Sequence, residues 1–298
     1  MDRIRNAVTR ARQKREGHRA EAPAVDAPVA AAQPAAAQQA AAKQTAAKQA
    51  GAAVQAARAA RGPSPHGDDL GLARVECDFE HFARNRIIAN EQDPVLNAYR
   101  VLRTRVLQKM DAEGWKTMAV VSPGAGAGKT VTAINLAIAL SSKAGSRATL
   151  IDLDFYRPSI ARYLGIRNFP SVLDFFEGKC GFRDVAVRPG LSDIVLAANE
   201  RVTRRGAEHL TSARADEMIE TAVNDFGSRT VIFDMSPLLG CDDTLAFLPK
   251  VDCVLLVAAS GDTRVHELKE ANRILAKSNI IGTVLNKSPS AFMPNQYY

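Results

Sequence analysis

Cysteine is scarce in this sequence, and its spacing forms no recognisable pattern. The four cysteines are scattered and include no C-x-x-C pair: Cys77, Cys180, Cys241 and Cys253. They support neither a disulfide framework nor a cysteine metal site. We expect reduced thiols, and we expect Cys241, which lies closest to the strand ends described below, to be a buried or bystander thiol.

Long apolar runs are also absent. No stretch approaches the roughly 18 apolar residues that a membrane-spanning helix needs. The start at Met1–Arg5 is basic, but it is not followed by the apolar segment of a secretory signal. The sequence therefore predicts a cytoplasmic protein, which would reach the inner face of a membrane through a partner or a weakly basic arm.

Most of the chain lacks a surplus of either charge. The formal net charge is +7, from 39 Lys and Arg against 32 Asp and Glu. Residues 1–75 hold 12 of these basic and 6 of these acidic residues, a net +6, so the remainder is close to neutral. A neutral domain is not suited to coating a polyanion, and we predict no nucleic-acid partner.

The first 75 residues are low in complexity. A basic start leads into an Ala/Gln/Lys stretch over about 22–60 and then into Gly62–Pro65. Such a composition builds no core, although alanine favours transient helix. We predict a disordered, basic, Ala-rich arm over 1–75, a folded domain over 76–288 and a short tail over 289–298. The arm is a solvated tether, or it touches anionic lipid, polymer or a partner.

The folded part alternates strand and helix patterns. Several strand patterns are apolar throughout, such as Thr149–Ile151 and Val254–Val257, as expected of strands covered on both faces. This order is typical of an α/β fold with a doubly wound, mostly parallel sheet, which binds its ligand at the carboxyl ends of the strands. The predicted strands are 117–122, 147–152, 193–197, 229–234, 252–258 and 281–286. The predicted helices are 95–107, 128–142, 158–164, 207–225, 242–248 and 264–277.

A Gly-rich turn joins the first of these strands to the next helix. It runs from Pro123 to Thr130 and reads P-G-A-G-A-G-K-T, close to the phosphate-binding pattern G-x-x-x-x-G-K-[ST] but with Pro123 in place of the first glycine. Glycine accepts positive φ, and the N–H groups of such a turn attract phosphate together with the helix start. The sequence therefore predicts a P-loop, the site of a nucleoside triphosphate.

The residues of this loop have distinct predicted roles. Lys129 can reach the β- and γ-phosphates, and the Thr130 hydroxyl can bind Mg²⁺. The residues expected to contact ATP here are Gly124, Gly126, Ala127, Gly128, Lys129, Thr130 and Val131.

Acidic residues follow two other predicted strands. Asp152 and Asp154 alternate on an extended chain and point the same way, so beside a P-loop they could hold Mg²⁺ and accept a proton, unless they are a surface pair. Asp234 ends an apolar strand, as in a Walker B element, and would bind Mg²⁺ directly or through water. The candidate catalytic residues are Lys129, Asp152 and Asp154; the candidate metal ligands are Thr130, Asp152 and Asp234.

Polar residues late in the chain supply the remaining candidates. Asp242 and Asp243 either cap a helix or lie near the metal. Asn286 ends the last strand, where its amide could read a nucleobase edge or simply form a turn. Tyr297 and Tyr298 lie in a tail that contains Pro and Ser, and they are candidate phosphoacceptors or plain tail residues.

These motifs together resemble those of the bacterial tyrosine kinases (BY-kinases) of capsule and exopolysaccharide synthesis, over about residues 85–287. Ser122–Thr130 resembles the Walker A motif of that family, and Asp152–Asp154 resembles its additional Walker A′ motif. Asp234 resembles its Walker B aspartate. One departure lies in Walker A′, where Tyr156 stands at the usual arginine position and Arg157 follows one place late. Another lies after Walker B, where the family often has Thr-Pro-Pro and this sequence has Met235–Pro237.

Two further parts of the chain take part in the resemblance. Tyr99–Arg103 is similar to the helix that mediates subunit contact, although Asn97 stands where the family motif E-x-x-R-x-x-R has Glu. Tyr297 and Tyr298 stand where the family carries a tyrosine cluster. The resemblance implies a P-loop NTPase fold, ATP and Mg²⁺ as cofactors, a homo-oligomer whose subunits phosphorylate one another, and a separate membrane-bound polysaccharide co-polymerase as activator.

Two other functions stay open at this point. A partition- or division-site-type ATPase would carry an additional lysine five residues before Lys129, where this sequence has Gly124. A regulator that binds ATP and tunes polysaccharide assembly without phosphorylating anything would need the P-loop but not the tyrosines.

Overall fold

Eight strands in the described chain form one sheet. A computed structural model describes residues 70–88, 95–142 and 146–288, and its sheet has the order β1-β4-β5-β3-β6-β2-β7-β8. Every pair of neighbouring strands is parallel except β4 with β5. The strands are β1 Ala73–Arg74, β2 Thr117–Val121, β3 Ala148–Leu153, β4 Val187–Arg188, β5 Ile194–Ala197, β6 Thr230–Met235, β7 Cys253–Ala259 and β8 Ile280–Asn286.

The doubly wound, mostly parallel sheet predicted from the sequence is confirmed. All six predicted strands occur, each displaced by no more than one residue at either end. The strands β1 and β4 were not predicted, because two residues are too few to show a period. Both join the sheet at the same edge, where β1 pairs with β4.

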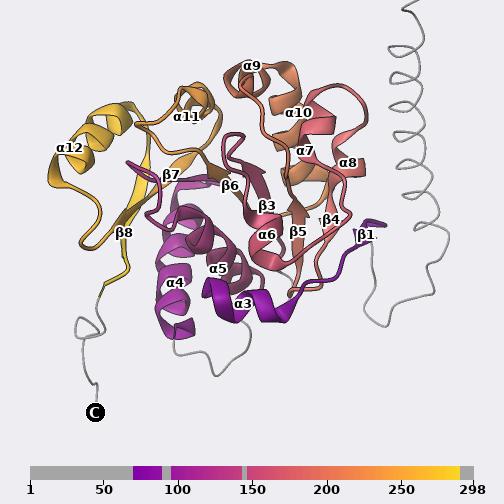
Figure 1. The fold of residues 1–298 in the computed structure, drawn as a ribbon, viewed down its shortest axis with the longest axis horizontal. Coiled ribbons are helices and arrows are strands. Elements are labelled where there is room, and N and C mark those ends of the chain that lie inside the picture. The colour runs from indigo at the N-terminus through magenta and orange to yellow at the C-terminus, as the bar shows by residue number, and fades with distance from the viewer. Residues whose placement is uncertain (1–69, 89–94, 143–145, 289–298) are drawn as a thin grey trace, which may run out of the picture. The chain divides into compact units, whose positions relative to one another are not determined.

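Helices cover both faces of the sheet. In Figure 1, α3, α4 and α5 lie on one side and α9, α10 and α11 on the other. The helices are α3 Phe79–Asn85, α4 Leu96–Glu113, α5 Lys129–Ser141, α6 Ile160–Leu164, α7 Val172–Phe176, α8 Phe182–Val185, α9 Gly206–Thr211, α10 Ala213–Glu220, α11 Asp243–Phe247 and α12 Val265–Ile274. No helix in the described ranges is both long and apolar enough to cross a bilayer.

The single helix predicted over 207–225 is wrong. It is divided at Ser212, which has an extended backbone with ψ of 162° and separates α9 from α10. A π-helical turn at Thr221–Asp225 then follows α10. The short helices α3, α7 and α8 were not predicted either, since four to seven residues carry little helical periodicity.

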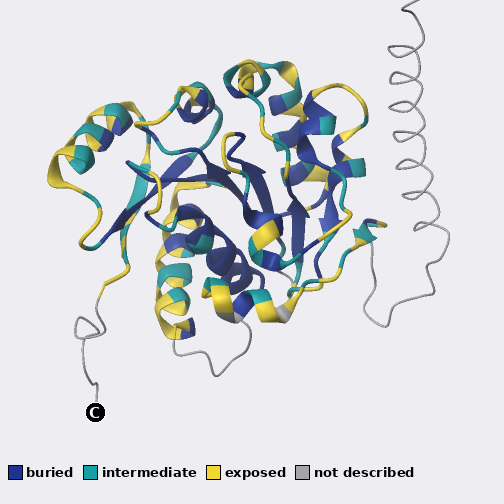
Figure 2. Ribbon diagram, viewed as in Figure 1, coloured by how far each residue is buried: buried dark blue, intermediate teal, exposed yellow. Residues whose placement is uncertain are grey.

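Two apolar clusters hold the layers together. Alternate residues of one strand enter different clusters: on β2, Ala119 and Val121 join the cluster beneath α7, α9 and α10, and Met118 and Val120 join the cluster beneath α4 and α5. This is the period of two that a strand imposes. Figure 2 shows the resulting buried strands between helices with exposed outer faces.

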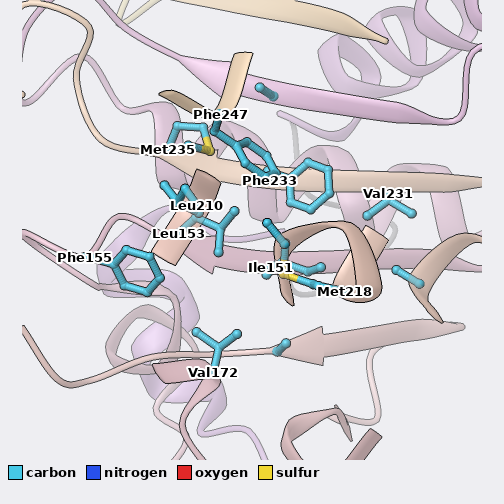
Figure 3. Packing of buried hydrophobic residues seen from close by; sticks show 14 of the residues in the cluster. Ile151, Leu153, Phe155, Val172, Leu210, Met218, Val231, Phe233, Met235 and Phe247 are labelled. Carbon is cyan, nitrogen blue, oxygen red and sulfur yellow. The ribbon is translucent and has the colours of Figure 1, made fainter. Parts of the chain in front are cut away.

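Aromatic rings fill much of the first cluster, which Figure 3 shows. Phe233 of β6 meets Phe247 of α11 edge to face, with ring centroids 4.9 Å apart. Phe155, two residues after the end of β3, meets Phe176 of α7 in the same geometry at 5.6 Å. These contacts fix the helices on this face to the strands whose carboxyl ends carry the candidate residues.

The folded part begins before the predicted boundary at residue 75. Leu72 is buried in the first cluster, and Ala73–Arg74 form β1, so these residues of the predicted arm pack on the sheet. Residues 1–69 of the arm and the tail from 289, with its two tyrosines, lie outside the described residues.

The aromatic contact between β6 and α11 yields a stability prediction. Replacing the fully buried Phe233 by Ala (Phe233→Ala) should lower the free energy of unfolding by about 3–5 kcal/mol, because a cavity replaces the ring. Urea denaturation measures this loss. Val101→Ala, at a position 54% exposed on α4, is the control and should change little. A loss for Phe233→Ala as small as the control's would contradict the packing described here.

Candidate functional site

The candidate residues gather at one edge of the sheet because of the strand order. The neighbouring strands β3, β6 and β2 run parallel, so their carboxyl ends lie together. The register pairs Asp152 of β3 with Asp234 of β6. The Gly-rich loop leaves the end of β2 and leads into α5. Residues about 100 positions apart in the sequence therefore meet at this edge.

The Gly-rich loop has the backbone that its glycines allow. Gly126 and Gly128 have φ of 82° and 88°, in the left-handed region that other residues rarely adopt. A Cβ added at Gly128 would collide with the Asn286 amide, whereas one at Gly126 would meet no atom within 4 Å. The space beside Gly126 is thus open to a ligand, and Gly128 is the N-cap of α5.

Lys129, the first residue of α5, lies buried among carboxylates. Its ammonium is 2.7 Å from Asp154 Oδ2 and 3.4 Å from Asp234 Oδ1, and it also donates to Thr130 Oγ1 at 3.3 Å. Burial acts to lower the pKa of Lys129, but the charges of Asp234 and Asp154 outweigh it and raise the pKa. Lys129 is therefore charged at every physiological pH.

Thr130 connects the same helix to the end of β6. Its hydroxyl donates to Asp234 Oδ2 at 2.7 Å, and the Asp234 side chain is fully buried. Burial raises the pKa of Asp234, against the opposing effect of Lys129. Thr130 and Asp234, two of the oxygen ligands that the sequence predicts for Mg²⁺, are therefore in direct contact.

The two aspartates of the Walker A′-like motif have different surroundings. Asp152 Oδ2 accepts the backbone N–H groups of Ser159 and Ile160, at 3.0 and 3.1 Å, and so fixes the start of α6. Burial raises the pKa of Asp152 well above its ordinary value, and the Asp234 charge adds to this. Asp152 is completely buried and faces protein on all sides.

Asp154 instead faces a cavity. Its carboxylate binds Lys129, accepts the Ser236 hydroxyl at 2.9 Å and accepts the Arg157 N–H at 3.0 Å. Burial acts to raise the pKa of Asp154, but Lys129 outweighs it and holds the pKa below its ordinary range. Of the acidic pair, only Asp154 lines the cavity.

This cavity has a volume of about 590 Å³ and three walls. The Gly-rich loop supplies one wall, the segment after β3 the second, and the segment after β6 the third. Its lining includes the predicted residues Gly124, Gly126, Gly128, Lys129, Thr130, Val131 and Asp154. The residues that were not predicted to line it include Tyr156, Arg157, Ser159, Arg162, Tyr163, Ser236, Leu239 and Glu267. Tyr156, Arg157 and Ser236 closely follow the two acidic motifs. The others come from loops and from α6 and α12, where no motif marks them.

The donor set fits a nucleotide and a divalent cation. Three buried carboxylates surround one ammonium, so a further positive charge would be attracted to the cluster. No three His, Cys, Asp or Glu side chains in the described ranges could hold a metal ion. A cation here would therefore need further oxygen ligands, as Mg²⁺ does when it binds phosphate.

Other predicted residues lie at the rim or behind the loop. Asn286 donates its amide N–H to the Ala127 carbonyl at 3.0 Å and accepts the Lys287 N–H at 2.9 Å. It supports the loop from behind, since neither Ala127 nor Asn286 lines the cavity. Its contact with a nucleobase stays a prediction.

Cys241 belongs to the third wall, and Asp242 and Asp243 follow it in the chain. Cys241 lines the cavity, and burial raises the pKa of its thiol, which favours the neutral form. Asp242 is the N-cap of α11, although its side chain makes no cap hydrogen bond. Asp243 is buried against Gly206 at the start of α9, and burial raises its pKa to about 6.

The fold and the loop define a class of nucleotide-binding domain. Residues 118–297 match the family described as "CobQ/CobB/MinD/ParA nucleotide binding domain", and the chain belongs to this family.

Curated relatives confirm the resemblance to bacterial tyrosine kinases. The chain is 28% identical over 207 residues to the putative tyrosine-protein kinase EpsB of Ralstonia solanacearum. The matched region covers 69% of this chain and 27% of EpsB. It is 27% identical over 217 residues to the tyrosine-protein kinase YwqD of Bacillus subtilis, covering 68% of the chain and 86% of YwqD. The chain thus spans about a quarter of the length of the first of these relatives.

Solved structures show the same fold. The chimerical protein CapA2B2 superposes with a TM-score of 0.64 at 20% identity, over 74% of this chain and 97% of that one. The kinase domain of Escherichia coli tyrosine kinase ETK superposes with a TM-score of 0.61 at 20% identity, over 78% and 96%. The predicted P-loop NTPase fold is confirmed.

The buried charge cluster predicts how stability varies with pH. Lys129→Met removes the one cation among three carboxylates and should lower the free energy of unfolding at pH 7.5 by about 3–5 kcal/mol. The loss should shrink toward pH 5, since Asp152 and Asp234 have raised pKa values and take up protons more readily without Lys129. In the unchanged protein, the raised pKa of Lys129 and the lowered pKa of Asp154 keep their contribution constant from about pH 4 to 10.

Urea denaturation at pH 5 and 7.5 measures this difference. Lys269→Met, at an exposed position of α12, is the matched control and should cost little at either pH. An equal loss of unfolding free energy at both pH values for Lys129→Met would show that the loss does not come from carboxylates left without a neutralising charge.

Proposed function

We propose that this chain is an ATP-dependent protein-tyrosine kinase that phosphorylates copies of itself and regulates exopolysaccharide or capsule synthesis. One observation carries the proposal: Lys129, Thr130, Asp154 and Asp234 meet within hydrogen-bond distance beside an open Gly-rich loop. The relatives named tyrosine-protein kinases support the choice of tyrosine as acceptor.

The loop and Lys129 would bind the phosphates of ATP. Gly124, Gly126 and Gly128 line the cavity with the start of α5, and backbone N–H groups at a helix start attract phosphate. Lys129 would then share its charge between the phosphates and Asp154. Mg²⁺, held by Thr130 and Asp234, would neutralise charge on the phosphates.

Asp154 would accept the proton of the tyrosine hydroxyl. It is the only member of the acidic pair that lines the cavity, whereas Asp152 is engaged by the backbone of α6. In the transfer, the tyrosine oxygen forms a bond to the γ-phosphorus, the bond from that phosphorus to the β–γ bridging oxygen breaks, and ADP leaves. The hydroxyl proton passes to Asp154, and positioning supplies most of the catalysis.

The acceptors, the assembly and the activator belong to the same proposal. Tyr297 or Tyr298 of one subunit would be phosphorylated by its neighbour in a homo-oligomer. A separate membrane-bound polysaccharide co-polymerase would recruit and activate the kinase at the inner face of the membrane. Relatives named for exopolysaccharide systems, including the succinoglycan biosynthesis transport protein ExoP of Rhizobium meliloti, support this setting.

Phosphotyrosine in the native protein tests the proposal. Mass spectrometry of the chain purified from its own cells should find phosphate on Tyr297 or Tyr298, and none in Lys129→Ala, because the loss of Lys129 removes a phosphate-binding charge. The absence of phosphotyrosine from a protein that binds ATP, in the presence of its membrane partner, would overturn the kinase proposal in favour of a nucleotide-gated regulator.

A substitution at the proposed proton acceptor separates catalysis from binding. Asp154→Asn should lower the rate of tyrosine phosphorylation by about 10²–10⁴-fold, as loss of a general base does, while ATP binds at least as tightly as in the unchanged protein, because Lys129 is released from its 2.7 Å ion pair. Isothermal calorimetry and a radiolabelled phosphoryl-transfer assay measure the two quantities. Asp216→Asn, which makes the same change at an exposed residue of α10, should alter neither. Full activity of Asp154→Asn would exclude its role as base.

A further inference from the structure

Two arginines line the cavity without an anionic partner. Arg157 and Arg162 both belong to its lining and are exposed at its rim. Within the described residues, neither guanidinium has a carboxylate partner. Lys129, the other lining cation, is already bound by Asp154 and Asp234. The cavity therefore offers two guanidinium groups that its own acidic residues do not neutralise.

Many other arginines of the described chain are neutralised locally. Arg201 binds Asp174 and Glu177, and Arg147 binds Asp193. Arginine presents a planar set of donors that matches carboxylate and phosphate. Other exposed arginines, such as Arg167, also have no carboxylate among the described ion pairs, but Arg157 and Arg162 are the ones that line the cavity, where an anionic ligand can reach both.

The backbone places these arginines beside the proposed proton acceptor. The Arg157 N–H donates to Asp154 Oδ1 at 3.0 Å, so the residue is fixed against that carboxylate. Arg162 belongs to α6, whose first N–H groups are held by Asp152. Both arginines therefore belong to segments fixed by the acidic pair, and they line the same cavity as Asp154.

The Arg162 guanidinium is also oriented by a ring. It stacks over Tyr163, with its central carbon 5.1 Å from the ring centroid. Stacking uses the face of the guanidinium and leaves its N–H donors free in the plane. Tyr156, which is 40% exposed, lies on the same wall and offers a ring against which an acceptor tyrosine could pack.

This wall is distinct from the one suited to the nucleotide phosphates. The phosphate-binding N–H groups come from residues 124–130, whereas Arg157 and Arg162 belong to the segment from 154 to 163. We propose that Arg157 and Arg162 form an acceptor subsite that selects tyrosine segments with a carboxylate or phosphate beside the tyrosine. The inference rests on the proposed kinase function and names the substrate class of that site.

The subsite has a consequence for neighbouring tyrosines. Residues 289–298 contain no Asp or Glu, and Tyr297 and Tyr298 are adjacent. The first phosphate on this pair adds negative charge directly beside the second tyrosine. The second tyrosine is then the better acceptor, so singly phosphorylated chains are converted onward faster than they form and do not build up.

Peptide binding tests the subsite without requiring turnover. The probes are labelled peptides with Phe in place of the acceptor Tyr, flanked by Glu, by phosphotyrosine or by Gln. Fluorescence anisotropy with the full chain should show the Glu and phosphotyrosine peptides binding at least about fivefold more tightly than the Gln peptide. The preference should weaken as salt is raised, because the arginines are exposed.

Matched variants assign the preference to the two arginines. The double variant Arg157→Gln/Arg162→Gln should lose the preference, while Arg167→Gln, at an exposed arginine outside the cavity lining, should keep it. The two anionic peptides distinguish carboxylate from phosphate as the preferred group. Equal binding of the Glu, phosphotyrosine and Gln peptides, or a preference that survives in the double variant, would overturn the proposal.

Nucleotide binding separates this inference from its main competitor and from the kinase proposal. The dissociation constant for ATP, measured by calorimetry, should be unchanged in the double variant. A loss of ATP affinity equal to the loss of peptide affinity would show that the arginines bind the nucleotide, and would overturn the subsite. If the anionic peptides bind through the arginines but their tyrosine versions are never phosphorylated, the subsite stands and the kinase proposal fails.

Discussion

The ammonium of Lys129 is the interaction on which the candidate site depends. It neutralises carboxylates from two strand ends, Asp154 after β3 and Asp234 at the end of β6, and it is the first residue of α5. Burying three carboxylates without a cation would be costly. The same charge therefore joins the Gly-rich loop to the two neighbouring strands, and a phosphate that enters the cavity must compete for it.

The two aspartates of the acidic pair have different surroundings because α6 begins against one of them. Asp152 receives the first N–H groups of that helix and lies under protein, whereas Asp154 reaches the cavity. Asp152 thereby positions the wall that carries Arg162. The short segment from the end of β3 to α6 thus supplies the carboxylate proposed for proton transfer, the carboxylate that fixes α6, and the charged rim of the cavity.

The sequence predicted the strands and the loop because their signals are local. An apolar strand that ends in Asp234, or a Gly-rich turn that ends in Lys129, is read within about ten residues. The different surroundings of Asp152 and Asp154 were not predictable, because they depend on where α6 begins. Arg162 and Glu267 in the cavity carried no signal, since they come from helices whose placement the core decides. The break at Ser212 was missed for the same reason.

The contact between Asn286 and the phosphate loop limits how this site can change. The Asn286 amide holds the Ala127 carbonyl and occupies the space that a Cβ at Gly128 would need. Position 128 is therefore constrained both by its backbone and by a side chain 158 positions further along the chain. As such chains diverge, positions 128 and 286 are expected to covary. The end of the last strand thus helps to determine the shape of the phosphate loop.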